Sequence, residues 1–133
     1  MVSGGTLGAC DVVAFTATRD LDRARAFYAV VLGLELVEQT PIACVLAANG
    51  TTVRVSLVDD LTPAPYTVLG WLVPDIHASV RDLTARGVTF ERFDGMDQDH
   101  DGVWTAPSGD RVAWFKDPDG NTLSVTEATP ASS

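Results

Sequence analysis

The sequence predicts an α+β fold made of two consecutive βαβββ units that form a single domain. Two observations carry this prediction. Each half has a short apolar run that ends in an aspartate, at Asp20 and again 55 positions later at Asp75, and a segment of helical periodicity follows each aspartate. NGTTVRVSL and DGNTLSVTE, two stretches typical of a turn followed by a strand, also repeat at a spacing of 70 positions.

The first unit is expected over residues 9–58. Its first strand, VVAFTATR, leads to Asp20, a residue type that caps helix N-termini. Gly33 suits the C-terminal end of the following helix, and the strand LELVEQ comes next. The strands IACVLAA and TTVRVSL flank the hairpin-turn dipeptide Asn49-Gly50. The apolar positions at helical spacing are Leu21, Ala24, Tyr28 and Val31.

The second unit repeats this order over residues 66–127, after a linker at residues 59–65. The strand VLGWLV leads to Asp75, and the helix that follows meets Gly87. A second strand is predicted in VTFERF, and the strands RVAWFK and NTLSVTE flank the turn at Asp119-Gly120. The helical positions are Ile76, Val80 and Leu83. The small, polar ends at residues 1–8 and 128–133 are expected to be flexible.

Composition and charge narrow the possible partners. The chain has 133 residues, of which 46% are hydrophobic, so one domain with a full core is expected. Its 18 acidic and 9 basic residues give a formal charge of −9, which argues against nucleic acids and anionic membranes as partners. The two cysteines show no CxxC spacing, and neither a secretory signal nor a membrane-spanning run is recognised. These features predict a cytoplasmic protein.

The acidic stretch DQDHDG at residues 97–102 matches the opening of a calcium loop. Ser108, however, stands where such a loop carries its bidentate glutamate, and the flanks read as strands rather than helices. An acidic surface loop with at most weak calcium affinity is therefore expected. His77, in the first turn of a predicted helix, is expected to be solvated, and His100 is the histidine that could reach a ligand.

Three stretches indicate a family: DLDRARAFYAVVLGLELV, VPDIHASVRDLTARGVTFE and AWFKDPDGNTLSVTE, of which FKDPDGN is the most specific. They cover nearly the whole chain and resemble the vicinal-oxygen-chelate superfamily. That superfamily contains glyoxalase I, extradiol dioxygenases, fosfomycin-resistance enzymes and bleomycin-binding proteins. With a helix on one face of each sheet, the opposite faces are free to form a shared concave cavity. The resemblance also implies a homodimer, in which the two units either close within one chain or swap between chains.

The metal-dependent members of that superfamily hold a divalent cation with His, Glu or Gln at four inward strand positions. Carried over to this sequence, the resemblance places these positions at Val13, Arg54, Val68 and Ser124. Valine cannot ligate a metal, and a guanidinium repels one. A metal-free subgroup is therefore expected, with no metal and no cofactor.

Strand alternation from these four positions predicts the cavity wall. Among the aromatic residues of the wall, Trp114 could stack on a planar ligand or could simply pack, and Trp104 could close the mouth of the cavity. Trp71 has the opposite parity and should pack under a helix. Cys44 could be a small hydrophobe or a reactive thiol, and Arg54 could pair with a carboxylate or with the ligand. The predicted ligand-binding residues are Val13, Phe15, Cys44, Arg54, Ser56, Val68, Gly70, Trp104, Val112, Trp114, Lys116, Ser124 and Thr126.

This wall favours a binding protein for a small hydrophobic or aromatic molecule, either a metabolite or an antibiotic. The bleomycin-binding branch of the resembled superfamily sequesters toxic molecules in this way without a metal. The alternative is a metal-independent isomerase or lyase, with Arg54 stabilising an oxyanion and Lys116 or His100 moving a proton. The inward strand positions carry no carboxylate or histidine to act as a general base, which favours binding.

Overall fold

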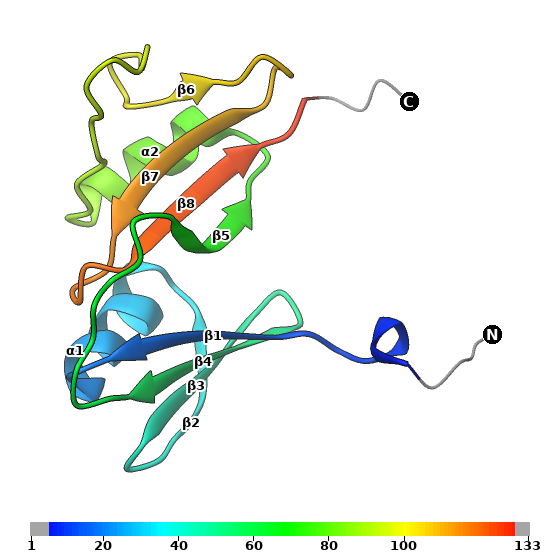
Figure 1. Cartoon of the computed structure of the whole chain (residues 1–133), viewed down its shortest axis with the longest axis vertical. Coiled ribbons are helices and arrows are strands. Elements are labelled where there is room, and N and C mark those ends of the chain that lie inside the picture. Colours follow the sequence, from blue (N-terminus) through cyan, green and yellow to red (C-terminus); the bar gives the residue numbers. More distant parts are fainter. Residues whose placement is uncertain (1–5, 130–133) are drawn as a thin grey trace. The chain divides into compact units, whose positions relative to one another are not determined.

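A computed structural model describes residues 6–129, which fall into two compact units that divide between Asp59 and Asp60 (Figure 1). Each unit has one four-stranded sheet with a helix on one face, so the α+β class and the two βαβββ modules are confirmed. The terminal segments expected to be flexible fall mainly outside the described residues. Within the described part, Leu7–Ala9 form a short 3-10 helix, η1.

Unit 1 has the strand order β1-β4-β3-β2, in which β1 runs parallel to β4 and the other pairs are antiparallel. Asp20 caps its helix as predicted, because the carboxylate accepts a hydrogen bond from the Arg23 N–H at 3.1 Å. Asn49 and Gly50 both have positive φ, 47° and 84°, as a two-residue hairpin turn requires. The elements are β1 (Val13–Thr18), α1 (Leu21–Arg25), η2 (Ala26–Val31), β2 (Glu35–Gln39), β3 (Ala43–Ala48) and β4 (Thr51–Leu57).

The helix predicted in one piece through Val31 changes type after its first turn. Residues of η2 form a π-helical segment, in which the Leu32 N–H reaches the Phe27 carbonyl at 2.9 Å. The chain then turns at Gly33, whose φ is +81°. Tyr28 is fully buried, so the apolar periodicity correctly identified the side of the helix that packs on the sheet.

Unit 2 has the order β5-β8-β7-β6, with β5 parallel to β8. Asp75 accepts a hydrogen bond from the Ala78 N–H at 3.1 Å, and the Ile76 N–H donates to the Glu127 carboxylate at 2.9 Å. The helix α2 lies behind β7 and β8 in Figure 1 and ends before Gly87, whose φ is +99°. The elements are β5 (Thr67–Leu72), α2 (Ile76–Ala85), β6 (Trp104–Thr105), β7 (Arg111–Lys116) and β8 (Thr122–Glu127).

The strand predicted in VTFERF is wrong as a regular strand. In this stretch, Phe90 makes a single bridge with Phe115, and the Glu91 N–H donates to the Trp114 carbonyl at 2.7 Å. Farther along, the free edge of β7 pairs with β6, where Trp104 lies opposite Val112.

The Gln98 side chain explains why the chain leaves that edge. Its amide oxygen accepts from the Phe93 N–H at 2.8 Å, and its amide nitrogen donates to the carbonyls of Glu91 and Gly102 at 3.0 and 2.9 Å. These bonds satisfy backbone groups that a strand would otherwise pair with β7.

The helix side of the unit 2 sheet carries the aromatic core. Phe115 is fully buried, and Trp71 stacks on it with ring centroids 6.4 Å apart. Phe90 contacts the same ring at 5.3 Å. The prediction that Trp71 packs on the helix side is therefore confirmed, which leaves the opposite face of the sheet open. No helix within residues 6–129 is both long enough and apolar enough to cross a lipid bilayer.

Candidate functional site

The open face of the unit 2 sheet is defined by strand register. Ser124 on β8 lies opposite Trp114 on β7 and Gly70 on β5, and residues that lie opposite each other share a face. Side chains two positions along each strand point the same way. The open face therefore consists of Thr67, Gly70, Leu72, Val112, Trp114, Lys116, Thr122, Ser124 and Thr126.

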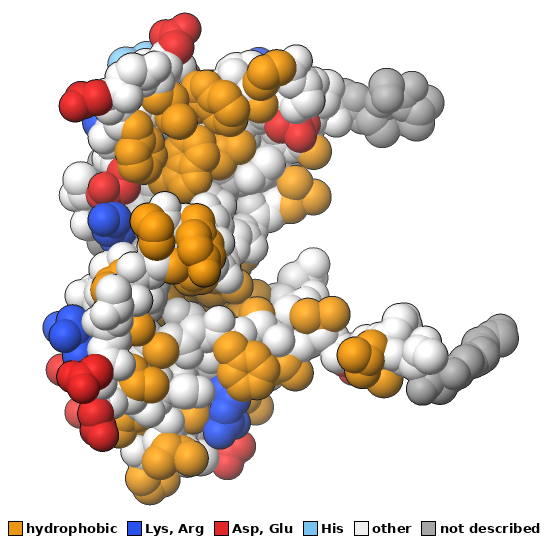
Figure 2. All heavy atoms as spheres, in the orientation of Figure 1, with side chains coloured by type: hydrophobic (Ala, Val, Ile, Leu, Met, Phe, Trp, Pro, Cys, Tyr) orange, Lys and Arg blue, Asp and Glu red, His pale blue; other side chains and the backbone are white. Residues whose placement is uncertain are grey.

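Three aromatic rings gather on this face, and we call Phe93, Trp104 and Trp114 the aromatic cluster. Phe93 meets Trp114 edge to face with ring centroids 5.5 Å apart, and Trp104 lies 6.1 Å from Trp114 at an interplanar angle of 37°. Phe93 is 40% exposed, and the two indoles are half-buried. Figure 2 shows hydrophobic side chains concentrated over β6 and β7. The cluster offers flat apolar surfaces to a ligand.

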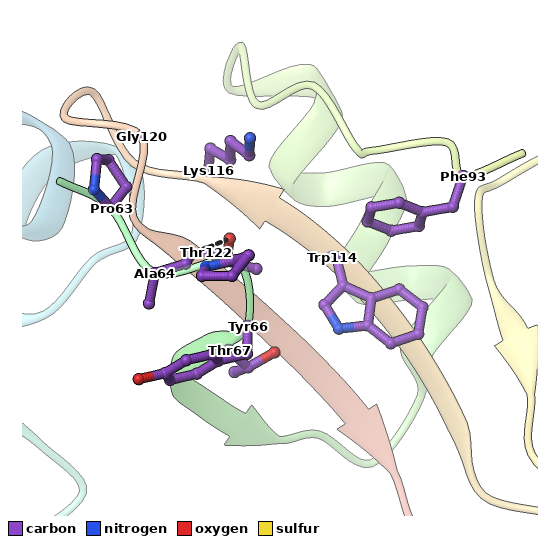
Figure 3. Close-up of a pocket in the computed structure, with 10 residues that line it drawn as sticks. Pro63, Ala64, Tyr66, Thr67, Phe93, Trp114, Lys116, Gly120 and Thr122 are labelled. Atoms are coloured by element: carbon purple, nitrogen blue, oxygen red, sulfur yellow. Dashed lines mark hydrogen bonds between the residues drawn. The ribbon is translucent and has the colours of Figure 1, made fainter.

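An open pocket of about 470 Å³ lies beside the aromatic cluster (Figure 3). Phe93 and Trp114 stand on one side, and Tyr66, Thr67 and Thr122 stand on the other. The volume is in the range of sites that hold small organic molecules. The lining residues are Pro63, Ala64, Pro65, Tyr66, Thr67, Phe93, Trp114, Lys116, Gly120 and Thr122.

Of the predicted ligand-binding residues, Trp114 and Lys116 line this pocket. The wall formed by residues 63–67 was not predicted, because residues 59–65 were expected to be a linker. Phe93 was missed because it was assigned to a strand. One signal for the wall was the close succession of Pro63, Pro65 and Tyr66, since two prolines stiffen a segment and an aromatic residue follows them.

Gly70 and Ser124 show why β5 needs a glycine. A Cβ added at Gly70 would lie 2.9 Å from the Ser124 Oγ and 3.3 Å from the Ser124 carbonyl oxygen. The backbone of β5 therefore covers the serine, which is only 6% exposed. Ser124 is on the predicted face, but β5 limits its access to a ligand.

Val68 does not hold the register position assigned to it. The pairing of β5 with β8 shifts between Thr67 and Leu69, which leaves Val68 as an extra residue. Thr67 takes the position opposite Thr122 instead. The strict alternation used in the prediction fails here because a bulge interrupts it.

In unit 1, the same logic places Arg54 opposite Phe15 on β1 and Val45 on β3. Val13, Phe15, Arg54 and Ser56 share this open face, as predicted, and Phe15 is 61% exposed. Among residues 6–59, no carboxylate forms a salt bridge with Arg54, so no acid of its own unit neutralises the guanidinium.

The face predicted for Cys44 is wrong. Cys44 lies opposite Val55, is fully buried, and its thiol contacts the Leu21 carbonyl at 3.7 Å on the helix side. Thr52 and Thr122 are equivalent in the two repeats, and they pair with Ala47 and Lys116. Four residues separate Ala47 from Thr52, whereas five separate Lys116 from Thr122, so the connection between the last two strands is one residue longer in unit 2. The spacing of 70 residues therefore does not relate positions on β3 to positions on β7. A shift of one residue along a strand exchanges the two faces of the sheet. Ala43, Val45 and Ala47 occupy the open face instead.

We expect the two thiols to differ sharply in reactivity. Burial raises the pKa of Cys44, whereas Cys10 is exposed. A disulfide reagent such as Ellman's reagent at pH 8 should modify one thiol per native chain rapidly, and the second only after denaturation. Cys10→Ser should remove the rapid phase, and Cys44→Ala should keep it. Two rapid thiols in the native protein would contradict the assigned burial.

The acidic loop is held against α2. The Asp99 carboxylate contacts the His77 Nε2 at 2.8 Å and accepts hydrogen bonds from the Asp101 and Val103 N–H groups at 2.9 and 3.0 Å. Burial raises the pKa of Asp99, but these hydrogen bonds outweigh it and hold the pKa below its usual value. His77, which was expected to be solvated, keeps 29% of its side chain exposed and also pairs with Asp99.

Neighbouring contacts fix the rest of this loop. Asp101 pairs with Arg81 of α2 at 3.4 Å, and the Arg92 guanidinium donates to the carbonyls of Asp99 and His100 at 2.6 Å each. His100 lines a separate recess of about 270 Å³ with Val80 and other residues of the helix side. It does not line the pocket beside the aromatic cluster.

The side chains at the four expected metal positions do not fit a divalent cation. Val13, Arg54, Val68 and Ser124 offer neither imidazole, thiolate nor carboxylate. Elsewhere in residues 6–129, no three His, Cys, Asp or Glu side chains gather as ligands for one ion. These side chains therefore provide no set of metal ligands for a metal-dependent reaction.

Comparisons with known proteins identify a family. The family model described as the Glyoxalase/Bleomycin resistance protein/Dioxygenase superfamily matches residues 11–125. A comparison with curated proteins found no match.

Solved structures share the fold. A superfamily member from Sphaerobacter thermophilus DSM 20745 is 28% identical, with a TM-score of 0.70, covering 90% of this chain and 98% of that one. A glyoxalase/bleomycin resistance protein/dioxygenase from Alicyclobacillus acidocaldarius is 21% identical, with a TM-score of 0.67 and coverage of 92% and 93%. A lactoylglutathione lyase from Agrobacterium tumefaciens is 20% identical, with a TM-score of 0.66 and coverage of 90% and 94%.

Proposed function

Because the chain belongs to the Glyoxalase/Bleomycin resistance protein/Dioxygenase superfamily, we propose that it is a metal-independent binding protein for a hydrophobic, aromatic small molecule. The ligand is a metabolite or an antibiotic that the protein sequesters. The observation that carries this proposal is the pocket of about 470 Å³ beside the aromatic cluster of unit 2. A ring laid on Trp114 replaces water over an apolar surface and gains stacking.

The lining of the pocket supports binding over catalysis. It contains no histidine, aspartate or glutamate, and its titratable side chains are Tyr66 and Lys116. A proton-transfer enzyme needs a base with a pKa near the working pH and within hydrogen-bond reach of the substrate. Two residues were considered for this role, His100 and Lys116. His100 lines the recess beside α2, whereas Lys116 lines the pocket. A single lysine with no carboxylate or histidine beside it in the lining supports the isomerase or lyase alternative less than the aromatic wall supports binding.

For unit 1 taken by itself, we propose that Arg54 binds an oxygen atom of a molecule that contacts the open face of that unit. Its neighbours across the strands are Phe15 and Val45, and no carboxylate of residues 6–59 pairs with it. A cation among apolar side chains is stabilised when an anion or a dipole approaches it. We further propose a cytoplasmic homodimer, in accord with the resemblance from which the dimer was expected.

Native mass spectrometry tests this proposal directly. After incubation with cell extract or culture extract, the protein should retain an organic molecule, and elemental analysis should find no stoichiometric transition metal. Chain masses in the same spectra report the oligomeric state. Close to one zinc, nickel, iron or manganese ion per chain, held in untagged protein, would overturn the metal-independent assignment.

A further inference from the structure

Most basic side chains of unit 2 already have an acidic or carbonyl partner within the protein. Arg81 and Arg86 form ion pairs with Asp101 and Asp82 at 3.4 and 3.3 Å. Arg111 pairs with Glu127 at 3.4 Å.

The two remaining cations of unit 2 are Arg92 and Lys116. Arg92 donates to two backbone carbonyls, as described above. Lys116 is the single lysine of the chain, and it forms no ion pair with any residue in the described part of unit 2, residues 60–129. It is thus the one basic group of that part left without a protein acceptor.

This lysine lies at the pocket. Lys116 is two residues beyond Trp114 on β7, so both side chains are on the open face, and it pairs across the strands with Thr122. No other lining residue carries a full charge at neutral pH, and none is acidic. Figure 3 shows the lysine stem rising beside the pocket that Trp114 and Phe93 border.

We propose that the ligand of this pocket is an aromatic acid, whose ring stacks on Trp114 and whose carboxylate binds the Lys116 ammonium. This inference rests on the proposed function, because it specifies the ligand class of the same site. Residues two apart on a strand are separated by about 6.6 Å. The flexible lysine stem can therefore reach a carboxylate attached to the ring directly or through a short chain.

The size of the expected effect follows from exposure. Lys116 is exposed, so water and salt weaken its attraction for a carboxylate, and charge pairs of this kind change affinity by at most about fivefold. The formal charge of −9 spread over the chain opposes any anion, but ions screen charges more than about 8 Å away at physiological salt. The nearby ammonium therefore dominates the choice between an anion and its neutral analogue.

The test compares naphthalene-2-carboxylate with its neutral amide, naphthalene-2-carboxamide, by equilibrium dialysis at pH 7. Wild-type protein should bind the carboxylate about two- to fivefold more tightly than the amide, and added salt should reduce this preference. Lys116→Met should remove the preference, because it should lower the affinity for the carboxylate more than the affinity for the amide. Arg111→Met removes the same charge from the opposite face of the same strand and should leave both affinities unchanged.

Two results would overturn the inference in distinguishable ways. The first result is that both probes bind with equal affinity, that Lys116→Met changes neither affinity, and that Trp114→Leu lowers both. This result would refute the aromatic acid as ligand and leave the proposed function intact. The second result is that neither probe binds, or that Trp114→Leu does not change the affinity. This result would show that the pocket is not the binding site, and it would refute the proposed function as well.

Discussion

Replacing Asp117 by alanine is expected to lower the free energy of unfolding of the protein by about 3 kcal/mol or more, because bonds to a buried carboxylate are worth about 1.5–3 kcal/mol each. The carboxylate, in a residue only 5% exposed, accepts hydrogen bonds from the Asp119 N–H at 3.0 Å and the Asn121 N–H at 2.9 Å. It also accepts from the Asn121 amide group at 2.8 Å. Alanine would leave these donors in a site where water has little access.

Tryptophan emission during urea unfolding measures this effect, since all three tryptophans lie in unit 2. Asp117→Asn keeps an amide oxygen as an acceptor and should cost less than alanine. Asp97 is exposed, so Asp97→Ala is a matched control that should change stability by no more than about 0.5 kcal/mol. A loss below about 1 kcal/mol for Asp117→Ala would show that the turn does not depend on this carboxylate.

Local signals in the sequence predicted the elements that local physics determines. Asp20 and Asp75 cap helices because a carboxylate satisfies N–H groups of the first turn, whatever the helix later packs against. Gly33 and Gly87 end them because glycine tolerates a positive φ. These rules act within a few residues, so the order of elements and the βαβββ repeat could be predicted from the sequence.

Strand faces depend on the number of residues in each turn, and this is where Cys44 was misplaced. The signal was present, since Asn49-Gly50 is a dipeptide of two-residue hairpins, which pairs Ala48 directly with Thr51. Counting back from that pair gives the observed face of Cys44. Aligning the two repeats instead carried over the longer turn of unit 2.

The pocket wall depends on contacts between segments that are distant in sequence. Pro63 lies close to Gly120, since a Cβ added at Gly120 would be 3.2 Å from the Pro63 ring. This contact brings residues 63–67 beside the end of β7. Phe93 reaches Trp114 because the Gln98 side chain diverts the chain from the sheet edge. Neither contact follows from periodicity or turn type, so the sequence identified Trp114 and Lys116 without the surface that faces them.

Trp114→Leu is expected to weaken the binding of naphthalene-2-carboxamide by about tenfold and to remove most of its quenching of tryptophan emission. Stacking on an indole is worth about 0.5–1.5 kcal/mol beyond the apolar area it buries, and the area adds a comparable amount. A loss of about 1.4 kcal/mol corresponds to a factor of about ten in the dissociation constant. The neutral probe isolates this effect from the charge of Lys116.

Trp71→Phe is the control for this substitution, because Trp71 belongs to the same unit but stacks on Phe115 on the helix side, and phenylalanine preserves an aromatic ring there. Its affinity for the probe should match that of the wild-type protein, although its emission spectrum will change. Circular dichroism should show that both variants are folded. If Trp71→Phe weakens binding while Trp114→Leu does not, the ligand occupies the helix side of the sheet, and the open face has another role. If both variants bind as the wild type does, neither indole contacts the ligand, and the aromatic cluster is a packing feature of β6 and β7.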